Sequence, residues 1–406
     1  MTPASFDLDD FIARQVIGRS ESLFAADLAA HDAELREGVE GKSVLVIGGA
    51  GTIGSSFIRA LLRYRPARLC VVDLSENGLT ELTRDLRSTP DQYVPENFTT
   101  YPVSFGDPVF ARMLRQEGPF DIVAHFAAHK HVRSEKDRYS IEAMLENNVV
   151  NTVKLLDLLT EQPPQHFFCV STDKAANPAN VMGASKKLME EAVLAYSSVL
   201  PATTARFANV AFSNGSLPAG FLERIARKQP LSAPSDVLRY FVSPIESGEL
   251  CLLACITGRP ADIFFPRLDA PQMLTFSSIA DALLRELGYE PDPQPSEQAA
   301  LAAAQLLTPQ STTWPVYYFT SDTSGEKGFE EFFTSGETVD LDRFAALGVV
   351  EGVATNDPAG IRSIIDNLHA LFAQSYLPKE AIVDVLVQLV PTFHHVETGK
   401  SLDQKM

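Results

Sequence analysis

The chain has 406 residues, of which 45% are hydrophobic and 21% are charged, so it is long enough to bury a large core. Its formal net charge is −18 at pH 7 and it has no dense run of lysine and arginine. These features argue against nucleic acid and anionic membranes as partners. An anionic ligand would need lysine, arginine or backbone N–H groups placed locally.

The sequence predicts a cytoplasmic protein. The amino terminus has acidic residues where a signal peptide has positive ones, and no segment approaches the roughly 18 apolar residues of a membrane span. The four cysteines form no C-x-x-C pair and are expected to be buried thiols.

Residues 1–40 are predicted to be a helical extension. Phe11, Ile12, Val16 and Ile17 recur near helical spacing, which fits either packing on the same chain or dimer formation.

From residue 41 onward, short β-branched runs alternate with amphipathic stretches, as in repeated βαβ units. The expected fold is therefore α/β, a Rossmann-type doubly wound and mainly parallel sheet with a smaller substrate-binding part and helical terminal extensions. The expected strands are 43–47, 69–72, 100–103, 122–125, 166–170, 205–208 and 262–265.

The predicted domain organisation follows from where this alternation stops. A Rossmann domain is expected over 41–212, with 235–268 returning to it. Prolines after residue 212 favour a substrate-binding part made of 213–234 and 269–345, in which 292–298 (DPQPSEQ) resembles a linker. Residues 346–406 are expected to form a helical tail with an apolar helix at 379–390, used for interaction or for homo-oligomer formation.

A glycine-rich turn connects the first expected strand to a helix at 55–63. Glycines there allow a tight turn, let backbone N–H groups approach a pyrophosphate at the helix N-terminus, and let helix and strand pack closely. The strand before and the helix after give the motif the context that a dinucleotide site requires. The expected cofactor-binding residues of this turn are Gly48, Gly51, Thr52, Ile53 and Gly54.

Asp73 ends the second expected strand, about 20 residues beyond Gly54, where a carboxylate reaches the adenosine ribose. Because a carboxylate would repel a 2′-phosphate, the sequence favours NAD over NADP. The alternative is that Asp73 only caps the next helix, although Ser75 could do the same. We also expect Asp107 to meet the adenine amino group, and Ala127 and Ala128 to lie flat against the cofactor.

Reactive side chains follow the fifth expected strand. Thr172, Asp173 and Lys174 come at the carboxyl edge of the sheet, where ligands bind in such folds. Further on, Met182 and Lys186 share one helix face, which is the Y-x-x-x-K spacing with methionine in place of tyrosine.

These motifs resemble the nucleotide-sugar 4,6-dehydratases of polysaccharide biosynthesis, a branch of the extended short-chain dehydrogenases. The resemblance covers about residues 42–270. It rests on GGAGTIG, DLSENGL, HFAAHKHV, Asn147-Asn148, STDKAANPANVMGASK, ARFANVAFSNGS and RYF.

The resemblance implies an NAD-dependent lyase that converts a nucleotide-diphosphate sugar, here UDP-N-acetylglucosamine, to a 4-keto-6-deoxy sugar. It implies that Lys174 is the base at C5, that Asp173 protonates the departing C6 hydroxyl, and that Thr172 bonds the C4 oxygen. Lys186 would hold the nicotinamide ribose and, as a cationic neighbour, help to lower the pKa of a lysine base. The implied substrate-binding residues are Lys130, Asn209 and Arg239.

Met182 departs from the usual mechanism because a thioether carries no proton. Asp173 or Lys174, through Thr172, would have to accept the proton of the C4 hydroxyl. Two alternatives stay open, a nucleotide-sugar C4 epimerase and a catalytically silent NAD-binding regulator. No metal is expected, because His129 and His131 do not supply the three or four ligands that a metal site needs.

Overall fold

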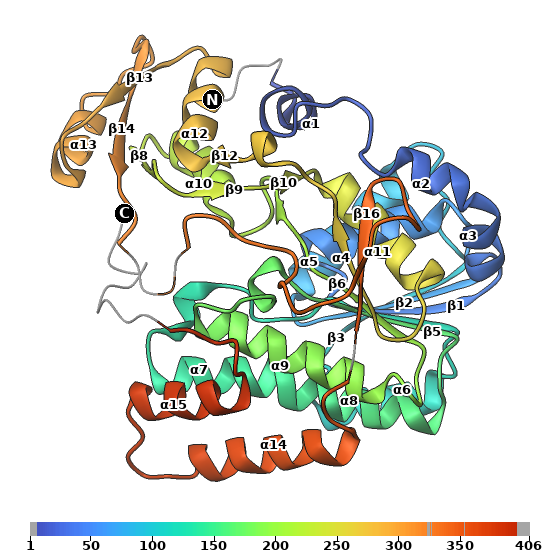
Figure 1. Cartoon of the computed structure of the whole chain (residues 1–406). Helices are drawn as coiled ribbons and strands as arrows, with labels where there is room; N and C mark the ends of the chain where they lie inside the picture. Colours follow the sequence, from blue (N-terminus) through green and yellow to red (C-terminus); the bar gives the residue numbers. More distant parts are fainter. Residues whose placement is uncertain (1–5, 323–324, 326, 353, 396–406) are drawn as a thin grey trace.

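The computed structural model describes residues 6–322, 325, 327–352 and 354–395 (Figure 1). A nine-stranded sheet forms its centre, in the order β15-β16-β11-β6-β5-β4-β1-β2-β3. The seven strands from β3 to β11 are parallel, whereas β16 and β15 add antiparallel pairs at one edge. The bounds are β1 Ser43–Ile47, β2 Arg68–Asp73, β3 Asn97–Pro102, β4 Ile122–His125, β5 His166–Val170, β6 Ala202–Ala205, β11 Asp262–Pro266, β15 Val339–Asp340 and β16 Leu347–Glu351.

Helices cover both faces of this sheet (Figure 1). One core cluster joins one sheet face to α3, α4, α5 and α11, and another joins the opposite face to α6, α8 and α9. This arrangement confirms the expected Rossmann-type α/β fold. The bounds are α3 Asp32–Val39, α4 Thr52–Leu62, α5 Glu76–Ser88, α6 Pro108–Glu117, α7 Arg138–Leu145, α8 Asn151–Glu161, α9 Val181–Tyr196 and α11 Pro244–Thr257; the π-helix η3, Glu146–Val150, joins α7 to α8.

A smaller part with its own core lies beside the carboxyl ends of the parallel strands (Figure 1). It contains a three-stranded sheet in the order β13-β14-β8 and two pairs of short strands. Its elements are β7 Asn209–Val210, α10 Leu217–Ala226, β8 Leu231–Pro234, β9 Leu238–Arg239, β10 Phe241–Val242, β12 Leu274–Thr275, α12 Phe276–Glu286, β13 Glu290–Pro293, α13 Glu297–Ala304 and β14 Thr313–Phe319.

The amino-terminal extension packs on its own chain. Phe11, Ile12 and Val16, in α1 (Leu8–Phe11) and in the π-helix η1 (Ile12–Val16), are buried in the core of the smaller part, with Ile17 packed against it. Farther along, α2 (Ala25–Ala30) contacts α11, and the buried Asp27 accepts hydrogen bonds from the backbone of Ala345 and Ala346. The apolar spacing is thus used for intrachain packing.

Three sequence-based expectations need correction. The strand expected at 205–208 begins three residues earlier, because β6 pairs with β5 from Ala202 onward and Arg206 enters an ion cluster instead. The stretch 292–298 is not a linker. Pro291 and Pro293 fit the edge strand β13, where a missing N–H is tolerated, and Ser296 caps α13.

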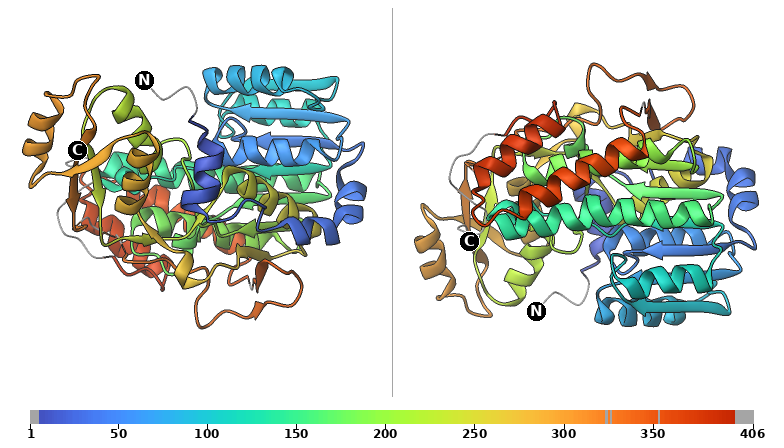
Figure 2. Two further views of the ribbon diagram at one scale, coloured as in Figure 1. Left: turned by 90° about the horizontal axis from the view of Figure 1, so that it is seen from above. Right: turned by 90° about the horizontal axis from the view of Figure 1, so that it is seen from below.

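The third correction concerns the carboxyl-terminal tail. The expected helical tail from residue 346 starts with a strand, because the apolar run of β16 pairs with β11. Only then come α14 (Pro358–Phe372) and α15 (Lys379–Leu389), which pack on α9 as an outer layer (Figure 2). The proposed division into domains remains a prediction.

Arg206, directly after β6, forms a buried ion cluster. Its side chain is 0% exposed; Nη2 lies 2.6 Å from Glu190 of α9 and 2.7 Å from Glu337, and Nη1 donates to the carbonyl of Phe332 at 2.9 Å. Burial alone would raise the pKa of Glu190, but the charges of Arg206 and Lys187 lower it to about 2. The cluster joins the end of β6 to α9 and to the segment that contains Phe332 and Glu337.

Replacing Arg206 with methionine should lower the free energy of unfolding by about 3–5 kcal/mol, because buried carboxylates would lose their main partner. Urea unfolding followed by circular dichroism measures this loss. Arg84→Met serves as the control, since its pair with Glu81 is exposed and contributes less than about 1 kcal/mol. Equal losses in the two variants would contradict the prediction.

Candidate active site

A cavity of about 250 Å³ opens at the carboxyl ends of β1, β2 and β4. The sheet order reverses between β1 and β4, and ligands of doubly wound sheets bind at such a switch point. Most of the residues expected to bind the cofactor line this cavity, namely Gly48, Gly51, Thr52, Ile53, Gly54, Asp73, Ala127 and Ala128.

The glycine-rich turn is shaped by close backbone contacts. Gly48 has φ +80°, and a Cβ there would lie 2.4 Å from the backbone nitrogen of Ala127. A Cβ on Gly54 would lie 2.3 Å from the carbonyl oxygen of Gly48. Gly51 caps α4, so the positive end of an 11-residue helix faces the cavity. The turn therefore has the form that holds a pyrophosphate.

Asp73 contributes to both the turn and the cavity. Its Oδ2 accepts a hydrogen bond from the backbone N–H of Ala50 at 3.0 Å, and its Oδ1 accepts one from the N–H of Ser75 at 2.9 Å. The cap of α5 is Ser75, whose hydroxyl accepts from Gly78. Helix capping therefore does not account for Asp73.

Asp107 does not line this cavity within the part of the chain that the structure describes. It is exposed at the N-cap position of α6, while Ser104 and Phe105 of the same loop line the cavity. Its contact with adenine remains a prediction.

A second cavity, of about 510 Å³, lies against the smaller part. Asn209 and Lys130 line it, as expected of substrate-binding residues, and Lys130 also lines the first cavity. Lys130 Nζ donates to the carbonyl of Asn214 at 3.0 Å. The sequence analysis missed Arg224, a lining residue on α10, because a single arginine in a helix gives no signal.

Thr172, Asp173 and Lys174 form one hydrogen-bonded group after β5. Oδ1 of Asp173 accepts from the Thr172 hydroxyl at 2.8 Å, from the Lys174 backbone N–H at 2.9 Å and from Lys174 Nζ at 3.0 Å. Asp173 is buried, whereas Thr172 and Lys174 are partly exposed. The Asp173 N–H donates to the carbonyl of Phe207, two residues before the cavity-lining Asn209.

Glu330 is a member of this group that the sequence analysis missed. Its Oε1 lies 3.8 Å from Lys174 Nζ and 3.9 Å from Arg239 Nη2. Burial raises the pKa of Glu330 above its ordinary value, although the charges of Lys174 and Arg239 act in the opposite direction. No motif surrounds this glutamate, so only the tertiary structure identifies it.

Arg239 is not placed as the resemblance implied. It is buried beside Glu330, its Nη1 donates to the carbonyls of Leu238 and Lys327, and it is not among the described residues that line either cavity. The Arg239 guanidinium is therefore engaged by groups inside the protein, namely the backbone carbonyls and the Glu330 carboxylate.

Met182 and Lys186 are both buried on α9. Met182 is 3% exposed within an apolar cluster. Lys186 Nζ donates to the carbonyl of Val170 at 2.7 Å, and burial lowers its pKa to about 8. Among the described residues, the carboxylates paired with Lys174 Nζ are those of Asp173 and Glu330. The expected role of Lys186 as a cationic neighbour of Lys174 remains a prediction.

Gly183 sets the distance between α9 and the reactive turn. A Cβ there would lie 2.6 Å from the carbonyl oxygen of Lys174. The glycine between Met182 and Ser185 therefore lets the helix approach the backbone that carries Lys174.

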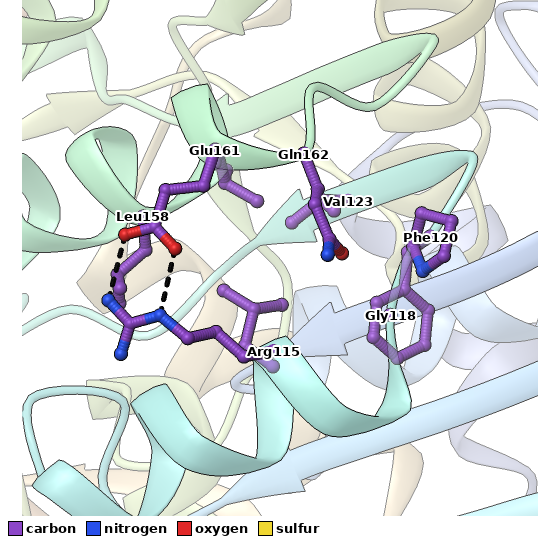
Figure 3. Close-up of a pocket in the computed structure, with 10 residues that line it drawn as sticks. Arg115, Gly118, Phe120, Val123, Leu158, Glu161 and Gln162 are labelled. Atoms are coloured by element: carbon purple, nitrogen blue, oxygen red, sulfur yellow. Dashed lines mark hydrogen bonds and ion pairs between the residues drawn. The ribbon is translucent and has the colours of Figure 1, made fainter.

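A further, smaller pocket lies between α6 and α8 (Figure 3). Arg115 and Glu161 form a bidentate ion pair beside it, with both hydrogen bonds at 2.8 Å. It lies at the amino ends of β4 and β5, opposite to the edge where ligands bind in this fold. We assign it no role.

The described residues contain no membrane-spanning helix and no metal-binding cluster. No helix among them is long and apolar enough to cross a membrane. No group of three or more histidine, cysteine, aspartate or glutamate side chains among them could hold a metal ion.

Replacing Gly54 with alanine should destabilise the protein by about 1–3 kcal/mol, because the new Cβ would strike the Gly48 carbonyl. Thermal unfolding measures the effect. Gly51→Ala is the matched control, since its Cβ would lie 3.5 Å from the same oxygen, an ordinary contact. A Gly54 variant as stable as the Gly51 variant would show that the turn is looser than described.

Two relatives of the chain are named as a membrane protein and as a polysaccharide biosynthesis protein. The chain is 30% identical over 258 residues to an uncharacterized membrane protein of Methanocaldococcus jannaschii. This match covers 62% of this chain and 74% of that protein. The chain is 26% identical over 373 residues to a probable polysaccharide biosynthesis protein, EpsC, of Bacillus subtilis, which covers 91% of this chain and 57% of that protein. This chain thus spans little more than half the length of the Bacillus relative.

Other relatives are named as nucleotide-sugar enzymes. A UDP-N-acetylglucosamine 4,6-dehydratase (inverting) of Campylobacter jejuni is 24% identical over 258 residues, covering 62% of this chain and 73% of the relative. A UDP-glucose 4-epimerase of Rickettsia typhi is 28% identical over 254 residues, covering 61% and 71%.

Two solved structures support the fold. The assignment to a family follows from the sequence. Pen of Bacillus thuringiensis has a TM-score of 0.62 at 20% identity, covering 87% of this chain and 99% of that one. DesIV of Streptomyces venezuelae, a dTDP-glucose 4,6-dehydratase with NAD and TYD bound, has a TM-score of 0.53 at 21% identity, covering 71% and 88%. The profile of the family described as polysaccharide biosynthesis protein matches residues 44–350, so this chain belongs to that family.

Proposed function

We propose that this protein is an NAD-dependent nucleotide-sugar 4,6-dehydratase that acts on UDP-N-acetylglucosamine in polysaccharide or glycoconjugate biosynthesis. The relatives of this chain include both a dehydratase and an epimerase of nucleotide sugars by name. The observation that carries the choice of a dehydratase is the Thr172-Asp173-Lys174 group at the end of β5, in which a partly exposed lysine is held by a buried carboxylate.

The first cavity fits NAD. The close contacts at Gly48 and Gly54 make a cradle that a side chain would fill, and the N-terminus of α4 favours a pyrophosphate. Asp73 lines the cavity where the adenosine ribose would lie. A homologous fold with NAD bound, DesIV, agrees with this assignment.

The second cavity is the proposed site of the nucleotide diphosphate. Lys130 and Arg224 supply cationic donors for the phosphates, and Asn209 supplies an amide. Lys130 borders both cavities, so the reacting sugar would lie near their junction. Thr172, Asp173 and Lys174 are not among the described residues that line either cavity, so the proposal requires the sugar to reach beyond this junction to the end of β5.

The proposed chemistry assigns a role to each of Thr172, Asp173 and Lys174. NAD, which the glycine-rich turn and Asp73 would hold, would supply a reversible hydride acceptor for oxidation at C4 and reduction at C6 of the sugar. Thr172 donates a hydrogen bond to the C4 oxygen, and Lys174 removes the C5 proton, which the C4 ketone has acidified. Asp173 orients both groups and is the proposed proton source for the C6 hydroxyl that leaves as water.

Met182 and Lys186 bear on two further roles, the acceptance of the C4 hydroxyl proton and the binding of the nicotinamide ribose. The Met182 thioether cannot accept the proton of the C4 hydroxyl, so that proton passes to the Thr172-Asp173-Lys174 group. Lys186 donates one of its three N–H groups to the Val170 carbonyl, and the others could hold the nicotinamide ribose if cofactor binding opens access to this buried side chain.

The product mass tests this proposal. Incubation with NAD and UDP-, GDP- or dTDP-sugars should give, from UDP-N-acetylglucosamine, a product lighter by one water. An isobaric product would identify a C4 epimerase, and unchanged sugars a silent NAD-binding protein. Lys174→Met should lower turnover by about a hundredfold or more. Lys154→Met, at an exposed lysine paired with Glu146, should leave it unchanged.

Asp73 should determine the choice of cofactor. Titration of the unmodified protein should show NAD binding at least about tenfold tighter than NADP, a difference of about 1.4 kcal/mol. Asp73→Asn keeps an acceptor for the Ala50 N–H but removes the charge that repels a 2′-phosphate, so it should narrow this ratio. Asp91→Asn, in an exposed loop, should not change the ratio. A preference for NADP in the unmodified protein would refute the assignment.

A further inference from the structure

Residues 329–337, which we call the strap, contact residues that follow β5 and β6 and reach the reactive group from a distant part of the sequence. Asn177 Nδ2 donates to Glu331 at 2.8 Å, and Arg206 Nη1 donates to the carbonyl of Phe332 at 2.9 Å. Arg206 also pairs with Glu337 at the far end of the strap. These contacts fix the strap on the carboxyl side of Glu330. On its amino side, the backbone carbonyls of Lys327 and Gly328 accept hydrogen bonds from Arg239.

The strap places the Glu330 carboxylate behind Lys174. The Glu330 side chain is 5% exposed and the Lys174 side chain is 16% exposed, with Oε1 and Nζ 3.8 Å apart. Thr172 and Lys174 are the partly exposed members of the group, whereas Asp173 and Glu330 are buried. A ligand at the strand end would meet Lys174 first, and Glu330 would act only through it.

Lysine is a base only as a neutral amine, so the proposed mechanism needs a group that takes the extra proton from Lys174. Two carboxylates lie near Lys174 Nζ, Asp173 at 3.0 Å and Glu330 at 3.8 Å, and transfer to Glu330 would need a small side-chain movement or one bridging water. Asp173 Oδ1 already accepts three hydrogen bonds, so this oxygen is engaged by the Thr172 hydroxyl and by both N–H groups of Lys174. Glu330 is held by longer contacts to Lys174 and Arg239, so it is the carboxylate left to receive a proton.

We propose that Glu330 is a positioning residue that accepts a proton from the Lys174 ammonium and so leaves Lys174 as the neutral base. The N–H bond of Lys174 breaks, an O–H bond forms on Glu330, and the pair changes from ammonium and carboxylate to amine and carboxylic acid. The proton returns to Lys174 when the C5 proton is delivered back, so no external acid or base is consumed. This inference rests on the proposed dehydratase function.

The charges around Glu330 are compatible with this exchange. Lys174, Asp173, Arg239 and Lys327 are the charged groups that act on it. Burial raises the pKa of Glu330, and the negative charge of Asp173 acts in the same direction. Both effects favour the protonated carboxyl, while Arg239 keeps the carboxylate form accessible.

The test compares Glu330→Gln with Glu331→Gln in the full-length protein with NAD and UDP-N-acetylglucosamine. Glu331 is the exposed neighbour, and glutamine there can still accept from Asn177. Glu330→Gln should lower kcat about a hundredfold near neutral pH, while NAD binding, thermal unfolding and KM change little. Its rate should then rise steadily with pH, because Lys174 can lose its proton only to solvent, whereas the rates of the unmodified protein and of Glu331→Gln stay level.

Glu330→Asp supplies the rescue. It restores a carboxylate on a shorter side chain, so part of the neutral-pH rate and the level pH profile should return. A merely electrostatic role of Glu330 would give the opposite sign: removing a negative charge beside Lys174 would favour the neutral amine and raise the rate at neutral pH. That result, or an unchanged pH profile in Glu330→Gln, would overturn the inference.

A second measurement needs no turnover, which separates this inference from the proposed function. If the unmodified protein leaves every nucleotide sugar unchanged, the dehydratase assignment fails by itself. The Glu330 carboxyl, followed by ¹³C NMR and assigned by its loss in Glu330→Gln, should titrate above the range of an ordinary glutamate, and Lys174→Met should shift that titration further upward. Titration in the ordinary range, indifferent to Lys174, would refute the proton exchange.

Discussion

The arrangement of the reactive edge depends on one buried guanidinium. Arg206 lies between Glu190 and Glu337, and Glu190 also accepts a hydrogen bond from Ser171, the residue before Thr172. A buried charge without partners is strongly unfavourable, so the strand end, α9 and the strap have to dock together. The position of the proposed base and the position of Glu330 are thus consequences of the same contact, which lies outside both cavities.

Close packing adds a second constraint on the same edge. Gly183 brings α9 against the backbone of Lys174, Gly54 brings α4 against the turn after β1, and Gly48 brings that turn against the backbone of Ala127. These contacts fix backbones rather than side chains, which lets Thr172 and Lys174 remain partly exposed while their supports are buried. In the proposed function, the exposed groups meet the sugar and the buried groups control their protons.

Sequence patterns were informative where function depends on local backbone geometry. The glycine turn, Asp73 and the group after β5 were all predicted, because each follows a strand whose apolar run is visible in the sequence. Glu330 was not predicted, since its partner Lys174 lies more than a hundred residues away and the strap has no periodicity. The shift of β6 has a related cause: Arg206 looked like part of a strand, and only its distant partners explain its burial.

The acidic composition of the chain makes the placement of its cations informative. Lys174 and Arg239 face carboxylates, so they add little positive potential for an anionic substrate, whereas Lys130 and Arg224 line the larger cavity. The resemblance implied that Arg239 binds substrate, but its guanidinium is buried beside Glu330 and is not among the described residues that line either cavity. If the proposed function holds, phosphate recognition and proton transfer use separate cations, because a cation neutralised by a buried carboxylate cannot also hold a solvated diphosphate strongly.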